Sequence, residues 1–280
     1  MMPTTSSSHN TEPAPLLRVV QITDTHLFGD PAGRLLGVNT QQSFEQVVEQ
    51  IAGIETPPDL MLATGDISQD ASIESYQRFA TTVSRLAAPC YWLPGNHDRF
   101  DVMRDLTDHR SLSVGKLERG NWLIILLDST QPGEVSGRLS EAELERLEQA
   151  LREAQQDSSP TEHVLVCLHH NPLPGRADWM HDIGLNNPDR LIELLSRYSS
   201  VRAVLHGHIH QQRDEYAHGL RFICTPSTCI QFKPQAGDFE LDGQAPGWRW
   251  LDLYEDGAIV SDVQRLENFE SSVDFESTGY

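Results

Sequence analysis

Oxygen and nitrogen ligands follow five separate apolar runs of this sequence, and their types suit a pair of metal ions. They are Asp24, His26, Asp66, Asn96, His169, His206 and His208. No cysteine thiolate is among them, so the set favours Fe, Mn or Zn held through oxygen and nitrogen. Seven such groups are too many for one tetrahedral ion but suit two ions that share a carboxylate. Two ions about 3.5–4 Å apart can hold the attacking and leaving oxygens of a phosphoryl transfer.

Two of these ligand pairs have a spacing of two residues. Residues at positions i and i+2 of an extended backbone leave the same face of the chain. Asp24 and His26 have this spacing, and so do His206 and His208. Gly207, between the two histidines, lets the backbone turn tightly. The spacing therefore predicts that each pair can hold one ion together.

The segments that must position the ligands alternate between strand-like and helix-like patterns. Strands are predicted at residues 17–23, 59–66, 90–96, 121–128, 163–168, 201–205, 219–226 and 247–266. Helices are predicted at residues 39–54, 72–86, 140–156 and 187–198. The ligands follow strand ends, which is where open α/β sheets bind their ligands. We therefore expect one α/β domain with helices outside its sheets.

The composition narrows the possible partners. The 280 residues include 21 Lys and Arg against 41 Asp and Glu, a formal charge of −20. This balance argues against a nucleic acid polymer, whose backbone needs a basic surface. The sequence has no apolar run of membrane-spanning length and no signal-peptide core, so we expect no membrane partner and a cytoplasmic location. Residues 1–16 are expected to form a disordered N-terminal tail.

These motifs, taken in their order along the chain, resemble those of a known family. The stretches "DTH" at residues 24–26, "GD" at 65–66, "GNHD" at 95–98, the later His169 and "HGH" at 206–208 are similar to those of calcineurin-type metallophosphoesterases. The resemblance covers about residues 19–210. It implies a four-layer α/β sandwich, with two mixed β-sheets flanked by helices. It also implies a metallophosphoesterase domain, which we expect at residues 17–266. The acidic composition of residues 267–280 predicts a C-terminal tail.

Further stretches resemble one branch of this family, the bacterial class III cyclic nucleotide phosphodiesterases. They are "LPGNHD", "HHNPLP", "HGHIHQ", "TPSTCIQFKP" and "APGWR". The resemblance implies that the substrate is 3′,5′-cyclic AMP, that the product is 5′-AMP, and that intracellular cyclic AMP is lowered. The choice of cyclic AMP over other cyclic nucleotides depends on this resemblance alone.

The resemblance also implies the roles of the ligands. Two divalent ions, Fe and/or Mn and possibly Zn, are the expected cofactors. The first ion would be held by Asp24, His26 and His208, and the second by Asn96, His169 and His206. Asp66 would bridge the two ions, since a carboxylate offers two anionic oxygens.

The expected catalytic residues are His97 and Asp66. His97 adjoins a ligand without being one, so we expect it to hydrogen-bond a phosphoryl oxygen and to protonate the leaving group. The alternative is an ordinary turn residue. The residues expected to contact the substrate are His26, Asp66, Asn96, His97, His169 and His208.

Several alternatives remain open at the level of the sequence. Asp70 either orients His97 or caps a helix, and Trp248 and Arg249 either contact the base or pack. His170 and His210 are candidates for supporting roles. The protein could be another metallophosphoesterase, such as a phosphatase or a different cyclic or linear phosphodiesterase, or a non-catalytic scaffold. The oligomeric state is unknown.

Overall fold

Two mixed β-sheets form the centre of the computed structural model, which describes residues 14–106, 115–270 and 272–279. The first sheet has the order β15-β14-β1-β4-β5, and β1, β4 and β5 run parallel. Its strands are β1 (Leu17–Ile22), β4 (Leu60–Thr64), β5 (Cys90–Leu93), β14 (Gly247–Leu253) and β15 (Ile259–Arg265).

The second sheet has the order β10-β11-β9-β8-β7-β6, with antiparallel strands at its two edges. Its strands are β6 (Gly115–Arg119), β7 (Trp122–Leu126), β8 (His163–Cys167), β9 (Val201–His206), β10 (Arg213–Ala217) and β11 (Leu220–Cys224). All five residues of β7 are buried, as expected for a parallel strand covered on both faces.

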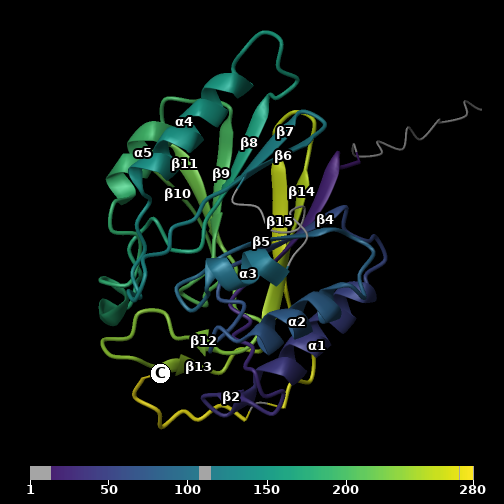
Figure 1. The fold of residues 1–280 in the computed structure, drawn as a ribbon, viewed down its shortest axis with the longest axis vertical. Helices are drawn as coiled ribbons and strands as arrows, with labels where there is room; N and C mark the ends of the chain where they lie inside the picture. Colours follow the sequence, from purple (N-terminus) through teal and green to yellow (C-terminus); the bar gives the residue numbers. More distant parts are fainter. Residues whose placement is uncertain (1–13, 107–114, 271, 280) are drawn as a thin grey trace, which may run out of the picture.

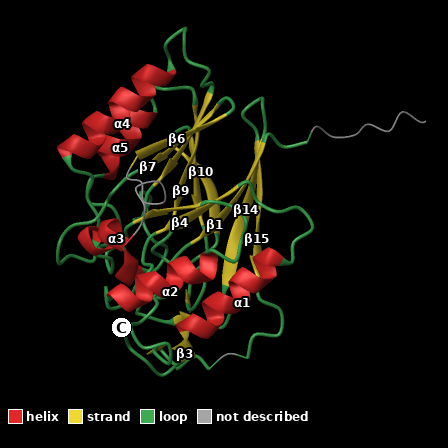
Figure 2. Cartoon of the chain, turned by 45° about the vertical axis from the view of Figure 1, so that its right-hand side comes forward, coloured by secondary structure: helices red, strands yellow, loops and turns green. Residues whose placement is uncertain are grey.

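Helices cover the outer face of each sheet (Figures 1 and 2). Helices α1 (Thr40–Ala52) and α2 (Ile73–Val83) pack their apolar faces on the first sheet. Helices α4 (Glu141–Ala154) and α5 (Pro188–Leu195) pack on the second sheet. A third buried cluster fills the space between the sheets. The expected four-layer α/β sandwich is therefore confirmed.

Local sequence signals account for the helix boundaries. Helix α4 begins after Ser140, whose side-chain oxygen accepts a hydrogen bond from the Glu143 N–H at 3.1 Å. This N-cap satisfies a backbone donor that the helix itself cannot pair. Leu144, Leu147 and Leu151 then fall on the buried face. The shorter elements are α3 (Phe100–Leu106), a 3₁₀ turn at Asp178–Met180, and the hairpins β2 (Arg34–Leu35) with β3 (Val38–Asn39) and β12 (Gln231–Phe232) with β13 (Leu241–Asp242).

The two predicted tails differ in how much of them the structure describes. Residues 1–13 of the predicted N-terminal tail lie outside the described residues. In the predicted acidic tail, the Asp274 N–H donates to the Leu36 carbonyl at 2.9 Å, and the Ser272 hydroxyl donates to the Gly37 carbonyl. These contacts connect residues 272–274 with the β2–β3 hairpin. The domain boundaries themselves stay a prediction. Among the described helices, none combines the length and apolar character needed to cross a bilayer.

Candidate metal centre

The carboxyl ends of five strands meet where the two sheets come together, and every predicted ligand loop starts there. Backbone hydrogen bonds join the loops after β1 and β4, such as Asp24 N–H to Gly65 O at 3.0 Å, and the loops after β8 and β9, such as Gly207 N–H to His169 O at 3.1 Å. The loop after β5 is joined to the loop after β4 through the side chains of Asp66 and Asp98. Side chains from these loops form overlapping clusters that could hold metal ions. The fully or almost fully buried members are Asp24, His26, Asp66, His169, His170, His208 and His210.

One group of ligand atoms lies beside the end of β1. The Nε2 atoms of His26 and His210 are 3.1 Å apart, and the Nε2 atom of His210 is 3.4 Å from Oδ1 of Asp24. The Nε2 atom of His26 is 3.8 Å from Oδ2 of Asp66. We call this group the first position.

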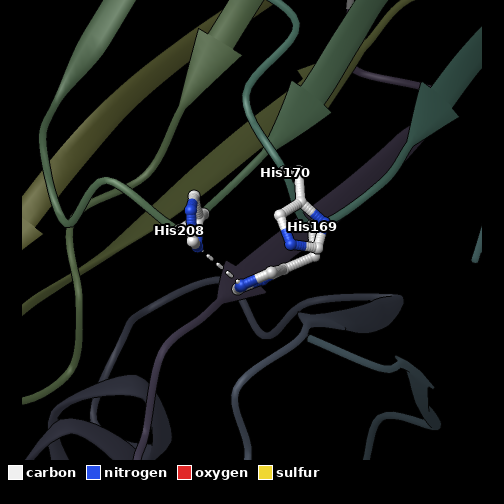
Figure 3. A group of neighbouring side chains, drawn as sticks. All are labelled: His169, His170 and His208. Carbon is white, nitrogen blue, oxygen red and sulfur yellow. Dashed lines mark hydrogen bonds between the residues drawn. The ribbon is translucent and has the colours of Figure 1, made fainter. Parts of the chain in front are cut away.

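A second group is centred on His169. Its Nε2 atom is 3.2 Å from Oδ2 of Asp66, 3.2 Å from Oδ1 of Asn96 and 3.2 Å from Nδ1 of His208. Figure 3 shows the contact between the rings of His169 and His208. We call this group the second position. Predicted ligands from β5, β8 and β9 thus meet around one point.

Asp66 belongs to both positions through a single oxygen. Its Oδ2 atom faces His26 on one side and His169 on the other. Its Oδ1 atom accepts a hydrogen bond from the backbone N–H of His97 at 2.9 Å. Oδ2 is thus the Asp66 oxygen directed at both groups, whereas the expected bridge would use both oxygens of the carboxylate.

Four histidines have their far ring nitrogen paired with a carbonyl oxygen. The pairs are His26 Nδ1 with Gln69 Oε1 at 2.6 Å, His169 Nδ1 with Thr64 O at 2.8 Å, His208 Nε2 with Ile183 O at 2.9 Å, and His210 Nδ1 with Ile230 O at 2.9 Å. A carbonyl can only accept, so the paired nitrogen carries a proton, and the other nitrogen offers a lone pair whenever the ring is neutral. Metal-binding histidines are oriented in this way. The donor set therefore fits metal ions at both positions.

His206 does not join this centre, which corrects the predicted ligand set. Its Nδ1 atom is 3.2 Å from the Gly207 carbonyl, and none of the described metal-competent clusters contains it. His206 is the last residue of β9, and its backbone pairs with Cys224 of β11. Beyond His206 the chain leaves the extended conformation, with φ of 72° at His208. The spacing of two residues therefore does not put His206 and His208 on the same face. The pair that enters the site is His208 and His210.

His170 lies beside His169 and His208 of the second position (Figure 3), but both of its ring nitrogens have other partners. Nδ1 is 2.8 Å from Ser129 Oγ, and Nε2 is 3.1 Å from the Val135 carbonyl. Although its ring is close enough to be grouped with His169 and His208, it has no lone pair left for an ion. His170 therefore connects the loop after β7 to the site.

Five of the clustered residues have a backbone conformation that is uncommon outside glycine. They are Asp24, His26, Asp66, His208 and His210, with φ between 47° and 72°. Such residues cost on the order of 1–3 kcal/mol each and concentrate at functional sites. Gly95 adds a packing constraint, because a Cβ atom there would overlap the carboxylate of Asp66. These strained backbone conformations direct the five side chains into the site.

The ionisation of the buried groups depends on their mutual contacts. Burial alone would raise the pKa of Asp66, but attraction to His169 and His97 lowers it well below its usual value. Burial opposes the charged form of His169 too, yet Asp66 raises its pKa to about 9. Burial lowers the pKa of His26 and of His208 to about 3. Without metal, the carboxylate of Asp66 therefore faces a cationic imidazole at His169, whereas the imidazoles of His26 and His208 are neutral.

This pattern predicts how pH controls metal binding. His169 must lose its proton to bind an ion, whereas His26 and His208 are already neutral. Below pH 9 each ion that enters the second position should displace about one proton, so its apparent affinity should rise up to roughly tenfold per pH unit. Titration calorimetry at pH 7 in buffers of different ionisation enthalpy should measure that proton. A count near zero, or of three or more, would contradict the assigned protonation states.

His97 stands at the accessible side of the centre. It is partly buried, and its ring meets that of His26 edge-on, with centroids 5.0 Å apart. It lines a cavity of about 580 Å³ together with Asn96, the start of α3 and the loop after β7. Asp98 holds this loop in place by accepting hydrogen bonds from the N–H groups of Ile67 and Ser68.

The contacts of Asp70, Trp248 and Arg249 bear on the remaining alternatives. The Asp70 carboxylate accepts hydrogen bonds from Gly29, Ser68 and Ser72, and Ser72 is itself the N-cap of α2, so Asp70 supports the cap residue. The indole N–H of Trp248 donates to Gln50. The buried guanidinium of Arg249 donates to Cys224 O, Thr225 Oγ1 and Ser261 Oγ. Trp248 and Arg249 therefore pack inside the fold.

Comparison with known proteins agrees with this geometry. The family model described as calcineurin-like phosphoesterase matches residues 17–212. The chain is 43% identical over 276 residues to a Pseudomonas aeruginosa protein named 3′,5′-cyclic adenosine monophosphate phosphodiesterase CpdA, which covers 98% of this chain and 100% of that one. It is 43% identical over 266 residues to the protein of the same name from Escherichia coli (strain K12), over 94% of this chain and 95% of that one.

A solved structure of a dimetal phosphatase from Danio rerio has the same fold. It superposes with a TM-score of 0.68 at 16% identity, and covers 90% of this chain and 96% of the other. Identity this low supports the fold alone, whereas the relatives at 43% match nearly the whole chain. With two clustered ligand positions at the meeting edge of its sheets, the chain belongs to the calcineurin-like phosphoesterase family.

Proposed function

We propose that this protein is a metal-dependent phosphodiesterase that hydrolyses 3′,5′-cyclic AMP to 5′-AMP. The observation that carries the proposal is the pair of ligand groups that share Oδ2 of Asp66. A phosphodiester has two oxygens that must be held during hydrolysis, and two adjacent ions suit that task. The choice of cyclic AMP is supported by the names of the relatives that match almost the whole chain.

The ligand assignment follows the two positions. The first ion would be held by Asp24, His26, His210 and Asp66, and the second by Asp66, Asn96, His169 and His208. Oxygen and nitrogen ligands of these types accept Fe, Mn or Zn. When bound, such ions supply Lewis-acid activation of the phosphoryl group and a nucleophile at neutral pH. Two buried carboxylates alone would repel a phosphodiester anion, so the cations are also needed for substrate binding.

The side chains around the ions complete the chemistry. The backbone N–H of His97 holds Oδ1 of Asp66, which leaves Oδ2 directed at both positions. The imidazole of His97 extends from the same loop to the cavity, where the leaving 3′ oxygen of a bound nucleotide would lie. An imidazole there can donate the proton that this oxygen needs. His97 would thus donate the proton to the leaving oxygen, and its neighbour Asn96 would help to hold the second ion.

Two other functions are less consistent with these features. A nuclease that tracks a long polymer needs a basic surface, which a formal charge of −20 opposes. A scaffold that only binds partners has no need for four histidines with fixed tautomers around a shared carboxylate. The site geometry therefore favours a small phosphodiester substrate.

Turnover of a substrate panel by metal-reconstituted protein tests the proposal. The panel contains 3′,5′-cyclic AMP, 2′,3′-cyclic AMP, 5′-AMP and bis(p-nitrophenyl) phosphate. We expect the highest kcat/KM for 3′,5′-cyclic AMP, with 5′-AMP accumulating as the end product. Preferred hydrolysis of 5′-AMP would instead identify a phosphatase. No turnover of any member with two ions bound would favour the scaffold.

The revised ligand set predicts opposite results for two neighbouring histidines. Replacing His210 by Ala removes an atom of the first position, so the protein should keep about one ion and lose most of its activity. Replacing His206 by Ala removes no ligand, so both ions should remain. Elemental analysis of the two purified variants measures the difference. Loss of an ion from H206A but not from H210A would restore the assignment made from the spacing.

A further inference from the structure

The cavity beside His97 is large enough for a nucleoside. It has a volume of about 580 Å³ and is lined by residues 96–101 on one side and by residue 128 and residues 130–133 on the other. Small-molecule pockets typically measure ~300–1,000 Å³. Asn96 and His97 form part of its wall, so a ligand whose phosphate lies at the metal positions can extend its base into this space. The cavity beside His210, about 290 Å³, is smaller.

Asp128 lines this cavity. Its Oδ1 atom accepts two hydrogen bonds from Thr130, one from the N–H at 2.8 Å and one from the hydroxyl at 2.7 Å. Within residues 14–106, 115–270 and 272–279, no hydrogen bond reaches Oδ2. Asp128 is partly buried, and burial raises its pKa. A ligand donor that reaches Oδ2 would satisfy this remaining acceptor.

Phe100 adds an aromatic surface to the same cavity. It is the first residue of α3, is partly buried and lines the wall next to His97. Nucleobases stack on such rings, and this stacking does not depend on the identity of the base. A stacking ring therefore explains binding of a base, whereas a fixed acceptor is needed to select one.

We propose that Asp128 is a specificity-determining residue that accepts a hydrogen bond from the exocyclic amino group of adenine, while Phe100 supports the ring. The inference rests on the proposed cyclic AMP hydrolysis and concerns a different part of the substrate. Because Thr130 holds Oδ1, Oδ2 is the carboxylate oxygen left to meet a ligand. A 6-oxo purine such as hypoxanthine would place an acceptor where adenine has its amino group, and two acceptors repel.

Replacing Asp128 by Asn tests this directly. The Thr130 N–H should hold the amide oxygen at the Oδ1 position, so the NH₂ group takes the place of Oδ2. The acceptor becomes a donor, which favours cyclic IMP over cyclic AMP. We expect the ratio of kcat/KM for cyclic AMP over cyclic IMP to fall roughly 10–100-fold, the scale of one hydrogen bond to a charged group. Equal ratios in D128N and the parent would overturn the proposal.

Asp101 offers a matched control. It lines the same cavity, but it is exposed and its carboxylate is paired with Arg99. D101N should therefore leave the cyclic AMP to cyclic IMP ratio as in the parent. A similar fall in D101N and D128N would show that the ratio reports the charge of the cavity, and would overturn the specific hydrogen bond.

A measurement without any substitution covers the case in which D128N does not fold. The parent should discriminate by about tenfold or more between cyclic AMP and the cyclic phosphate of purine riboside, which lacks the amino group. Calorimetric binding of 5′-AMP and of purine riboside 5′-monophosphate should show the same preference. Equal values for the two bases would overturn the role of the amino group.

The two proposals fail in different ways. If the parent hydrolyses bis(p-nitrophenyl) phosphate but no cyclic nucleotide, the proposed function fails, and the binding preference for 5′-AMP still decides the role of Asp128. If cyclic AMP is hydrolysed and D128N leaves the base preference intact, the proposed function stands and the assignment of Asp128 is wrong.

Discussion

Replacing Asp66 by Ala should abolish activity and empty both metal positions together. Oδ2 of Asp66 lies 3.8 Å from Nε2 of His26 and 3.2 Å from Nε2 of His169, so its removal affects both groups of ligands. Changes to residues that only support a ligand typically cost ~10–100-fold, and loss of a shared ligand should exceed that. We expect kcat/KM for cyclic AMP to fall by more than roughly 10³-fold. Elemental analysis should show the metal content falling from two ions per chain toward zero.

Asp70 is the control for this experiment. It lies four residues after Asp66 in the same loop, and its carboxylate hydrogen-bonds Gly29, Ser68 and Ser72. D70N should therefore weaken the loop before α2 without removing an ion. Two ions retained by D66A, or lost equally from D66A and D70N, would refute the bridging role.

Much of the framework could be predicted because its signals are local. The uninterrupted apolar run at β7 predicted a strand covered on both faces, and Ser140 with Glu143 predicted the start of α4. The order of the ligands also indicated the family, since each follows a strand whose carboxyl end reaches the same edge. These inferences need only periodicity, capping and a general rule about sheets.

The prediction of His206 instead of His210 as a ligand was wrong because residue spacing does not show where a strand ends. Period two describes a strand, but β9 ends at His206, and the following backbone has φ of 72° at His208 and 48° at His210. The sequence "HGHIH" contains two pairs with equal spacing, so spacing cannot choose between them. One signal could have helped: His206 completes an apolar run and therefore belongs to the strand. His208 and His210 lie beyond it.

Other features have no signal in the sequence at all. The free oxygen of Asp128 becomes informative only when the loop after β7 is placed opposite α3 around one cavity. Likewise, the inward packing of Trp248 and Arg249 depends on partners about 12 to 198 positions away along the chain. Contacts at such separations depend on how the layers assemble, which periodicity cannot specify.

Replacing His97 by Ala should reduce turnover of cyclic AMP by roughly 10²–10⁴-fold while both ions stay bound. The substitution removes the imidazole but keeps the backbone N–H that holds Oδ1 of Asp66. The shared carboxylate should therefore keep its orientation. Replacing Asn96 by Ala should instead release the second ion, because its Oδ1 atom lies 3.2 Å from Nε2 of His169. Metal content thus separates the two neighbours before any rate is measured.

The rates then test what the imidazole does. The leaving 3′ oxygen of cyclic AMP departs as an alcohol and needs a proton, whereas p-nitrophenolate departs without one. H97A should therefore lose much less activity on bis(p-nitrophenyl) phosphate than on cyclic AMP, each compared with the parent. A variant of the exposed His218, H218N, controls for the loss of a surface imidazole. Equal losses on both substrates would leave His97 only the stabilisation of charge on the phosphoryl oxygens. Unchanged rates on both would return residues 93–98 to an ordinary turn, because an imidazole that neither donates a proton nor stabilises charge has no part in the reaction.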